Sequence, residues 1–203
     1  MPASLPRFAK GQKIGLLGGS FNPPHEGHHL ITRIALTRLR LDRVWWMVTP
    51  GNPLKSLNEL AALDDRVEKA RALFDDPRVA ITDFEAEIGA RYTCDSVAFL
   101  KARAPGVKFV WLMGADNLMQ FHLWRNWRAI AASCPIAVID RPGSTLKALA
   151  SPAAQAMARY RIPEREAAHL ADRPPPAFVF LHGPRSALSS SALRRRPGFT
   201  KPS

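Results

Sequence analysis

Short apolar runs of strand length alternate with longer segments of helical periodicity along most of this chain. The runs lie at residues 14–17, 44–48, 79–82, 107–112, 136–139 and 178–181. Nearly continuous apolar character over four to six residues is typical of strands that are buried on both faces, as in a parallel sheet covered by helices. The alternation therefore predicts an α/β fold with a Rossmann-like, doubly wound parallel sheet.

The segments between the runs contain recognisable helix signals. Apolar residues recur with helical spacing after the first run, and a helix is expected over 93–104. Ser151 followed by Pro152 predicts another helix start, and Asn58 predicts a capped start for a helix running to residue 73.

These signals suggest how the chain is divided. The expected division is a leader at 1–12, one domain at 13–196 and a tail at 197–203. Within the domain, residues 144–175 are expected to form a helical connection beside the sheet, and the chain then ends in a short helical part. The absence of internal repeats and of a long low-complexity linker favours a single domain.

The amino-acid composition limits the classes of molecule that this chain is expected to bind. The 203 residues include 29 Lys and Arg against 17 Asp and Glu, a net charge of +12. Such a surface suits anions, whether nucleic acid, an anionic membrane or phosphorylated small molecules, and charge alone does not choose among them. Cys94 and Cys134 match no metal-ligand spacing, so a cytoplasmic protein without a disulfide framework is expected. No apolar stretch approaches the ~18 residues of a membrane span.

Residues 18–28 combine several features of an anion site directly after the first predicted strand. The glycine pair at 18–19 lets the backbone approach a ligand, and amides at the start of the following helix favour an anion. His25 and His28 are three residues apart and fall on one side of that helix start, where both could donate to phosphate oxygens and could be cationic. His29 points to the opposite side and is expected to be structural.

A second anion-binding pattern lies near the end of the chain. Ser189, Ser190 and Ser191 could cap a terminal helix and present hydroxyls and amides to phosphate. Arg194 follows Ser191 by three residues, so it should lie on the same helix face.

Together the two patterns resemble a known pair of motifs. Residues 18–30, GGSFNPPHEGHHL, are similar to the G-x-F-x-P-x-H-x-G-H motif of nucleotidyltransferases related to class I aminoacyl-tRNA synthetases, and residues 188–194, LSSSALR, to their I-S-S-T-x-I-R motif. The departures in the second motif each keep chemical type. The resemblance implies a fold of the nucleotidyltransferase type with His25, His28 and Arg194 as catalytic residues. It also implies ATP and phosphate contacts from Gly18, Gly19, Ser20, Phe21, Ser189, Ser190 and Ser191.

The middle of the chain resembles bacterial nicotinate mononucleotide adenylyltransferases. Residues 52–55 are similar to that family's N-P-x-K loop, 91–96 to S-Y-T-x-D-T, 113–117 to its G-A-D segment, and 121–125 to F-H-x-W. The resemblance implies that Trp124 and the Tyr92-Thr93 loop surround a pyridine ring, with Arg125 nearby. It further implies that Gly114 and Asp116 contact nucleotide sugars and that Lys55 pairs with a phosphate.

The expected reaction joins ATP and nicotinate mononucleotide to give deamido-NAD and pyrophosphate. The mononucleotide phosphate is itself the nucleophile, so catalysis should consist of positioning and charge neutralisation. Mg²⁺ is expected on the ATP phosphates, because no carboxylate cluster marks a metal site of the protein's own.

Alternatives stay open at this point. The substrate could be the amidated mononucleotide or phosphopantetheine, although residues 113–116 and 121–124 argue against the latter. A basic RNA-binding module would explain the charge but would leave both nucleotide motifs unexplained. No nucleic-acid or membrane partner is expected, and the sequence is silent on oligomeric state.

Overall fold

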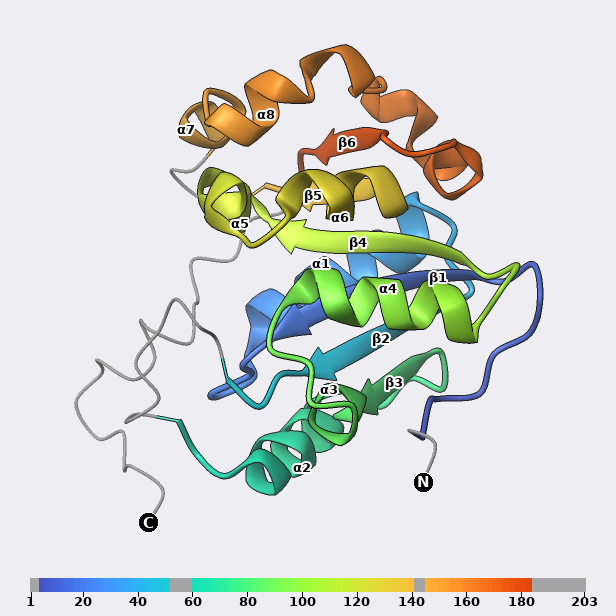
Figure 1. Ribbon diagram of the computed structural model, residues 1–203, viewed down its shortest axis with the longest axis vertical. Helices are drawn as coiled ribbons and strands as arrows, with labels where there is room; N and C mark the ends of the chain where they lie inside the picture. The colour runs from blue at the N-terminus through green and yellow to red at the C-terminus, as the bar shows by residue number, and fades with distance from the viewer. Residues whose placement is uncertain (1–3, 52–59, 141–144, 184–203) are drawn as a thin grey trace.

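The computed structural model describes residues 4–51, 60–140 and 145–183. These residues form a six-stranded sheet in which every neighbouring pair of strands is parallel (Figure 1). The strands are β1 (Lys13–Gly19), β2 (Arg43–Val48), β3 (Val79–Thr82), β4 (Lys108–Gly114), β5 (Ile136–Ile139) and β6 (Phe178–Leu181). Each lies at one of the predicted apolar runs, so the doubly wound α/β fold is confirmed.

The strand order reverses once, between β1 and β4. The order is β3-β2-β1-β4-β5-β6, so the chain moves outward from β1 to β3 and then returns to the centre before moving outward again. The carboxyl ends of β1 and β4 therefore lie side by side while their helices lie on opposite faces. Ligands of open α/β sheets bind at such a point.

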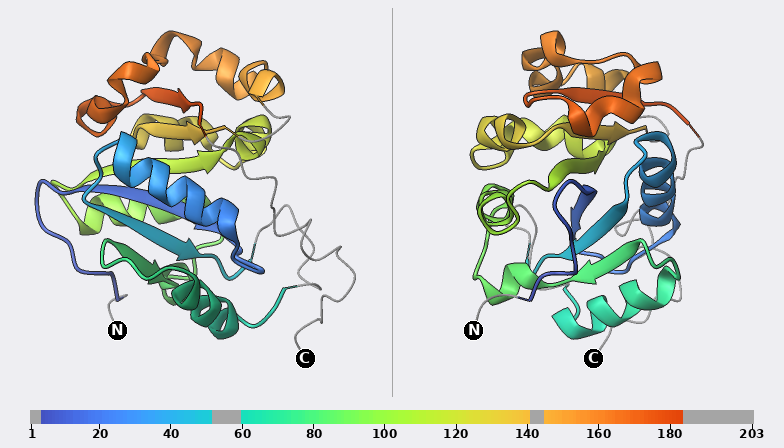
Figure 2. Two further views of the ribbon diagram at one scale, coloured as in Figure 1. Left: turned by 180° about the vertical axis from the view of Figure 1, so that it is seen from behind. Right: turned by 90° about the vertical axis from the view of Figure 1, so that its right-hand side faces the viewer.

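Helices cover both faces of the sheet (Figures 1 and 2). One face carries α1 (Glu26–Arg38), α2 (Leu63–Leu73) and the 3-10 helix η4 (Glu164–Asp172). The other carries α4 (Thr93–Arg103), α5 (Ala115–Gln120), α6 (Trp127–Ser133) and α8 (Pro152–Ala156). Shorter elements join them, namely α3 (Phe84–Glu87), η2 (Phe121–Leu123), α7 (Thr145–Leu149) and η3 (Ala158–Tyr160).

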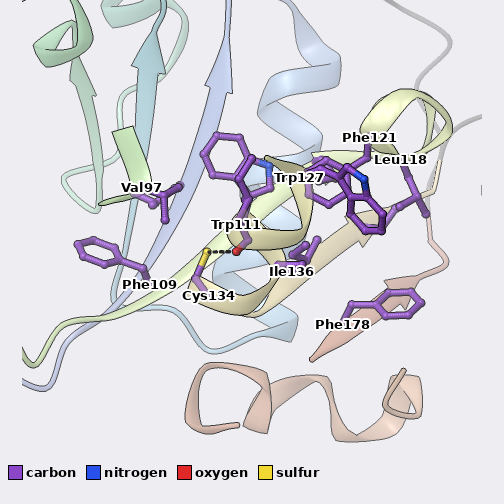
Figure 3. Packing of buried hydrophobic residues seen from close by; sticks show 14 of the residues in the cluster. Val97, Phe109, Trp111, Leu118, Phe121, Trp127, Cys134, Ile136 and Phe178 are labelled. Carbon is purple, nitrogen blue, oxygen red and sulfur yellow. Dashed lines mark hydrogen bonds between the residues drawn. The ribbon is translucent and has the colours of Figure 1, made fainter. Parts of the chain in front are cut away.

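The alternation of side chains along a strand divides the aromatic residues between two cores. Trp45 and Trp46 are neighbours on β2 and are both fully buried, yet Trp45 packs on the α4 side and Trp46 on the α1 side. On the α4 side, Trp111 and Trp127 gather above β4 and β5 (Figure 3). Cys134 is buried in the same cluster, and burial raises the pKa of its thiol to about 12.

Of the two predicted helix starts, one is confirmed and the other is wrong. The Ser151 prediction is confirmed, because its hydroxyl accepts from the backbone N–H of Ala154 and Pro152 opens α8. The Asn58 prediction is wrong: α2 begins only at Leu63, with Ala62 as its N-cap, while Asn58 lies outside the described residues. The physical reason lies just before the helix, where the side chain of Arg66 donates to the Ala61 carbonyl at 2.9 Å and ties down the extended entry segment.

Candidate active site at the ends of β1 and β4

The glycine pair at the end of β1 is required by the protein's own side chains. A Cβ atom on Gly18 would lie 2.8 Å from Cη2 of Trp111, and one on Gly19 would lie 3.3 Å from the ring of Phe21. From the sequence, this pair indicates a close approach of the backbone to a ligand, with a tight turn as the alternative. The structure adds that both positions lack room for a side chain because aromatic rings pack against the backbone from within.

Phe21 organises the loop that follows. Its backbone has φ of 47°, a left-handed conformation that is strained for a bulky residue, while its side chain is fully buried. The ring stacks on Trp46 with centroids 4.9 Å apart and contacts the His28 ring at 4.6 Å. Trp46 is fixed in turn by donating from its Nε1 to the hydroxyl of Thr32 at 2.8 Å. The loop conformation is thus held by an aromatic stack that ends on a histidine.

His25 and His28 together form the N-terminal cap of α1. The backbone N–H of Gly27 donates to Nδ1 of His25 at 3.0 Å, and the N–H of His25 donates to Nδ1 of His28 at 3.2 Å. This is the reciprocal geometry of a capping box, built from imidazoles. The two ring centroids are 3.9 Å apart, so the rings lie on one side of the helix start, as their spacing indicates.

The cap also assigns the protons of both rings. A backbone N–H can only donate, so each Nδ1 must accept and each Nε2 carries the ring proton. The cap therefore requires neutral imidazoles, whereas the sequence reasoning allowed cationic ones. Both rings can still donate to a phosphate oxygen through Nε2, from a helix start that itself favours anions.

His29 lies apart from this pair. Its ring packs against Phe74 with centroids 4.3 Å apart, and its Nδ1 lies 3.5 Å from a carboxylate oxygen of Glu26. These contacts agree with the structural role expected for His29.

The end of β4 contributes the opposite wall of the site. Gly114 is the last residue of β4 and the N-cap of α5, and Asp116 lies half-buried in the first turn of that helix. Because β4 pairs with β1, Gly114 and Asp116 lie at the same edge of the sheet as the glycine pair.

The residues expected around the pyridine ring come from two segments that meet. Tyr92 is the N-cap of α4, and the guanidinium carbon of Arg125 lies 4.6 Å from the centroid of its ring. Trp124 is half-buried and packs edge-on against Trp111 with centroids 6.1 Å apart. Since Trp111 also lies against Gly18, one indole connects the end of β1 with the aromatic wall.

Comparison with known proteins shows to which family this chain belongs. The model of the cytidylyltransferase-like family matches residues 16–196. A probable nicotinate-nucleotide adenylyltransferase of Methylorubrum extorquens is 61% identical, over 91% of this chain and all of the relative. One from Agrobacterium fabrum is 58% identical over 89% of this chain and 97% of the relative. The chain belongs to the nicotinate-nucleotide adenylyltransferase family.

A solved structure agrees with this membership at the level of the fold. The nicotinic acid mononucleotide adenylyltransferase of Plasmodium falciparum, complexed with NaAD, superposes with a TM-score of 0.67 at 16% identity. The match covers 91% of this chain and 83% of that one. The nucleotidyltransferase fold expected from the two motifs is therefore confirmed.

Five of the expected site residues of this adenylyltransferase-family chain lie outside the described residues. They are Lys55, Ser189, Ser190, Ser191 and Arg194. The structure places the others in three groups, at the start of α1, at the start of α5 and around the start of α4. Their roles stay predictions.

Two buried charged residues at this edge were not predicted from the sequence. Arg66 is 2% exposed and Glu85 is 6% exposed. Glu85 accepts from the hydroxyl of Ser96 at 2.5 Å, and burial raises the pKa of its carboxyl. A signal for Arg66 was present, because it continues the apolar stripe of α2 marked by Leu63, Val67 and Ala70 and so occupies a buried position.

Neither a metal-ligand cluster nor a membrane-spanning helix occurs among the described residues. No three His, Cys, Asp or Glu side chains there are grouped closely enough to hold a metal ion. None of the helices described is both long and apolar enough to cross a membrane.

Proposed function

We propose that this chain transfers the AMP moiety of ATP to nicotinate mononucleotide, giving deamido-NAD and pyrophosphate in NAD biosynthesis. An oxygen of the mononucleotide phosphate attacks the α-phosphorus of ATP, and the bond from that phosphorus to the bridging oxygen of pyrophosphate breaks. The observation that carries the proposal is the meeting of a histidine-capped helix start with an aromatic wall where β1 and β4 end. The relative that is 61% identical along its whole length supports it.

Catalysis in this proposal needs no activated side-chain nucleophile. Nε2 protons of His25 and His28 donate to phosphate oxygens as charge develops on the departing pyrophosphate, and backbone amides of Gly19 and Ser20 assist. Donors that are fixed before the reaction stabilise this charge without reorganising. The hydrogen bonds that hold both Nδ1 atoms supply that fixation.

The remaining phosphate contacts are carried over from the family motifs. Lys55 and Arg194 would neutralise phosphate charge, and Ser189, Ser190 and Ser191 would bind phosphate oxygens. Mg²⁺ bound to ATP would offset the charge of its triphosphate.

The start of α4 favours the acid form of the mononucleotide over the amide. Tyr92 is the N-cap, its side chain accepts no hydrogen bond from the first turn, and Thr93 opens the helix. A carboxylate is stabilised at such a helix start by the amides and the helix dipole, whereas a neutral carboxamide gains less. Trp124 offers a flat face for the ring, and the cation of Arg125 adds to the attraction.

Pyrophosphate release with three acceptors in parallel tests this function. The acceptors are nicotinate mononucleotide, nicotinamide mononucleotide and phosphopantetheine, each with ATP and Mg²⁺. The highest kcat/KM is expected for the acid mononucleotide. A preference for phosphopantetheine would overturn the assignment of residues 113–125, and a preference for the amide would overturn the role given to the start of α4.

Variants of His28 test the proposed mechanism. His28→Ala should lower kcat by about 10²- to 10³-fold, as loss of a transition-state donor does, with little change in KM for the mononucleotide. His28→Gln keeps a side-chain oxygen that can accept from the His25 N–H, so it should lose turnover while retaining the cap. His29→Ala removes a neighbouring imidazole that packs elsewhere and serves as the control. Near wild-type turnover in both His28 variants would exclude the role.

The setting of the reaction also remains part of the proposal. A reducing cytoplasm is the expected location, and no nucleic-acid or membrane partner is expected. Binding of RNA that weakens as salt is raised, in a chain that releases no pyrophosphate, would favour the alternative class of a basic binding module.

A further inference from the structure

The buried guanidinium of Arg66 fastens the loop after β1 to two other segments. Its Nη1 donates to the carbonyls of Ser20 and Thr49, each at 2.8 Å, and its Nε donates to the carbonyl of Ala61 at 2.9 Å. Its Nη2 makes a longer contact of 3.5 Å to the carbonyl of Pro50. One side chain on α2 thus holds the loop of the candidate phosphate site, the end of β2 and the entry to its own helix.

Within residues 4–51, 60–140 and 145–183, the contacts of this guanidinium are to main-chain oxygens rather than to a carboxylate. Among the described residues, the ion pairs involve other side chains, and the contacts of Arg66 are all to main-chain carbonyls. A buried cation is costly unless hydrogen bonds and an opposite charge compensate it. Burial accordingly lowers the pKa of Arg66. The carbonyls satisfy its donors, and the part of the chain that the structure describes places no carboxylate against it.

An anion in the loop after β1 would supply an opposite charge. The guanidinium lies directly behind Ser20, a residue whose amide is expected to face a phosphate. The end of β2 reinforces the same region, because the N–H of Thr49 donates to the carbonyl of Gly19 at 3.0 Å. Orienting the carbonyls of Gly19 and Ser20 toward the protein interior fixes the peptide planes of the loop and hence the direction of its amides.

We infer that Arg66 is a positioning residue for ATP: it fixes the amides of the loop after β1, and its positive charge attracts the triphosphate bound there. This inference rests on the proposed function for the identity of the anion. Beyond that function, it assigns a role in ATP binding to the positive charge of Arg66, which lies behind the loop and need not touch the nucleotide.

Two substitutions separate the charge from the geometry. Arg66→Met removes the charge and all donors and should raise the Kd for ATP about tenfold, the effect of one lost charge-assisted interaction. Arg66→Lys keeps the charge and should recover part of the affinity, but a single ammonium cannot reproduce the planar fork that reaches three carbonyls. Arg71→Met removes a charge from an exposed position on the same helix and should leave the Kd for ATP unchanged.

The experiment is calorimetric titration of each variant with ATP and Mg²⁺, and separately with nicotinate mononucleotide. Circular dichroism at the titration temperature establishes that each variant is folded. The inference expects the loss to fall on ATP, with the Kd for the mononucleotide changed less than about twofold. It is overturned if Arg66→Met binds ATP as the wild type does, if both ligands weaken equally, or if Arg66→Lys is no better than Arg66→Met.

The outcome is independent of turnover. ATP binding is measured without an acceptor, so a wrong acceptor would overturn the proposed function and leave this result standing. If Arg66→Met proves unfolded at the titration temperature, Arg66→Lys against Arg71→Met decides. Wild-type affinity for ATP in Arg66→Lys would then exclude the positioning role.

Discussion

Replacing Gly18 by alanine should destabilise the protein by an amount that the structure allows one to work out. The added Cβ would lie 2.8 Å from Cη2 and 3.3 Å from Cζ2 of Trp111, where ordinary contacts begin at 3.4 Å. The indole is only 2% exposed and cannot swing into solvent, so the overpacking should cost about 1–3 kcal/mol. Gly18 does not have a positive φ, so alanine also restricts the unfolded chain and returns about 0.4–1 kcal/mol.

The net loss, centred on about 1.3 kcal/mol, translates into a fall in Tm of about 3–5 °C for a domain of this size. Thermal unfolding followed by circular dichroism is the assay. Gly183→Ala is the matched control, because the nearest atom to its new Cβ is 3.7 Å away, at ordinary contact distance. It keeps the gain from the restricted unfolded chain without the clash, so its Tm should rise by about 1–4 °C rather than fall.

A second substitution tests the cause directly. Trp111→Phe removes both clashing atoms, so Gly18→Ala should cost much less in that background than in the wild type. A Gly18→Ala variant as stable as the wild type would refute the reasoning. Equal costs of the substitution in both backgrounds would refute the assignment of the clash to the indole.

Two further predictions concern stability and pH. Lys108 and Lys13 each place Nζ 2.7 Å from a carboxylate oxygen of Asp172 and lower its pKa to about 2, so their contribution exists above about pH 4 and is lost as pH falls through about 2. Asp172→Asn should therefore lower the free energy of unfolding at pH 7 by about 1 kcal/mol or less for so exposed a group, and the loss should be clearly smaller at pH 2; an equal loss at both would contradict this. Burial raises the pKa of Glu85, so the folded state binds its proton more tightly and loses stability as pH rises through that pKa. Glu85→Gln keeps an acceptor for Ser96, and its unfolding free energy relative to the wild type should be higher at pH 8 than at pH 5; the same difference at both pH values would contradict the assignment.

The strands were predictable because both faces of the sheet are covered. Burial on two faces leaves no polar alternation, and each run therefore appears in the sequence as a continuous apolar block. The helices α5 and α6 were not predicted, because at six and seven residues they are too short for a clear periodicity, and α5 follows β4 without a turn. The start of α2 was misplaced because the side chain of Arg66, from within the helix, holds the entry segment at Ala61, and no side chain of the N-cap residue sets it.

The arrangement of the candidate site was predictable where it depends on the spacing of residues along the chain. It was not predictable where it depends on packing between segments that are distant in sequence. The three-residue interval between His25 and His28 placed both rings at one helix start. The demand for glycine at position 18 comes from Trp111, which is distant in sequence, and the hold of Arg66 on Ser20 joins residues 46 positions apart. Contacts of this kind depend on how the strands are ordered in the sheet, which local sequence patterns do not encode.

The imidazole cap of α1 limits how this site could be altered. Serine or aspartate would cap a helix at least as well as His25, and stabilising substitutions of that kind are common in proteins. Here such a change would remove the phosphate donor proposed at His25, whereas removing His28 would also loosen the helix start that orients His25. The two histidines therefore cannot be optimised separately for folding and for chemistry. In the first turn of α1, the two imidazoles that we propose as phosphate donors are therefore also the groups that cap the helix.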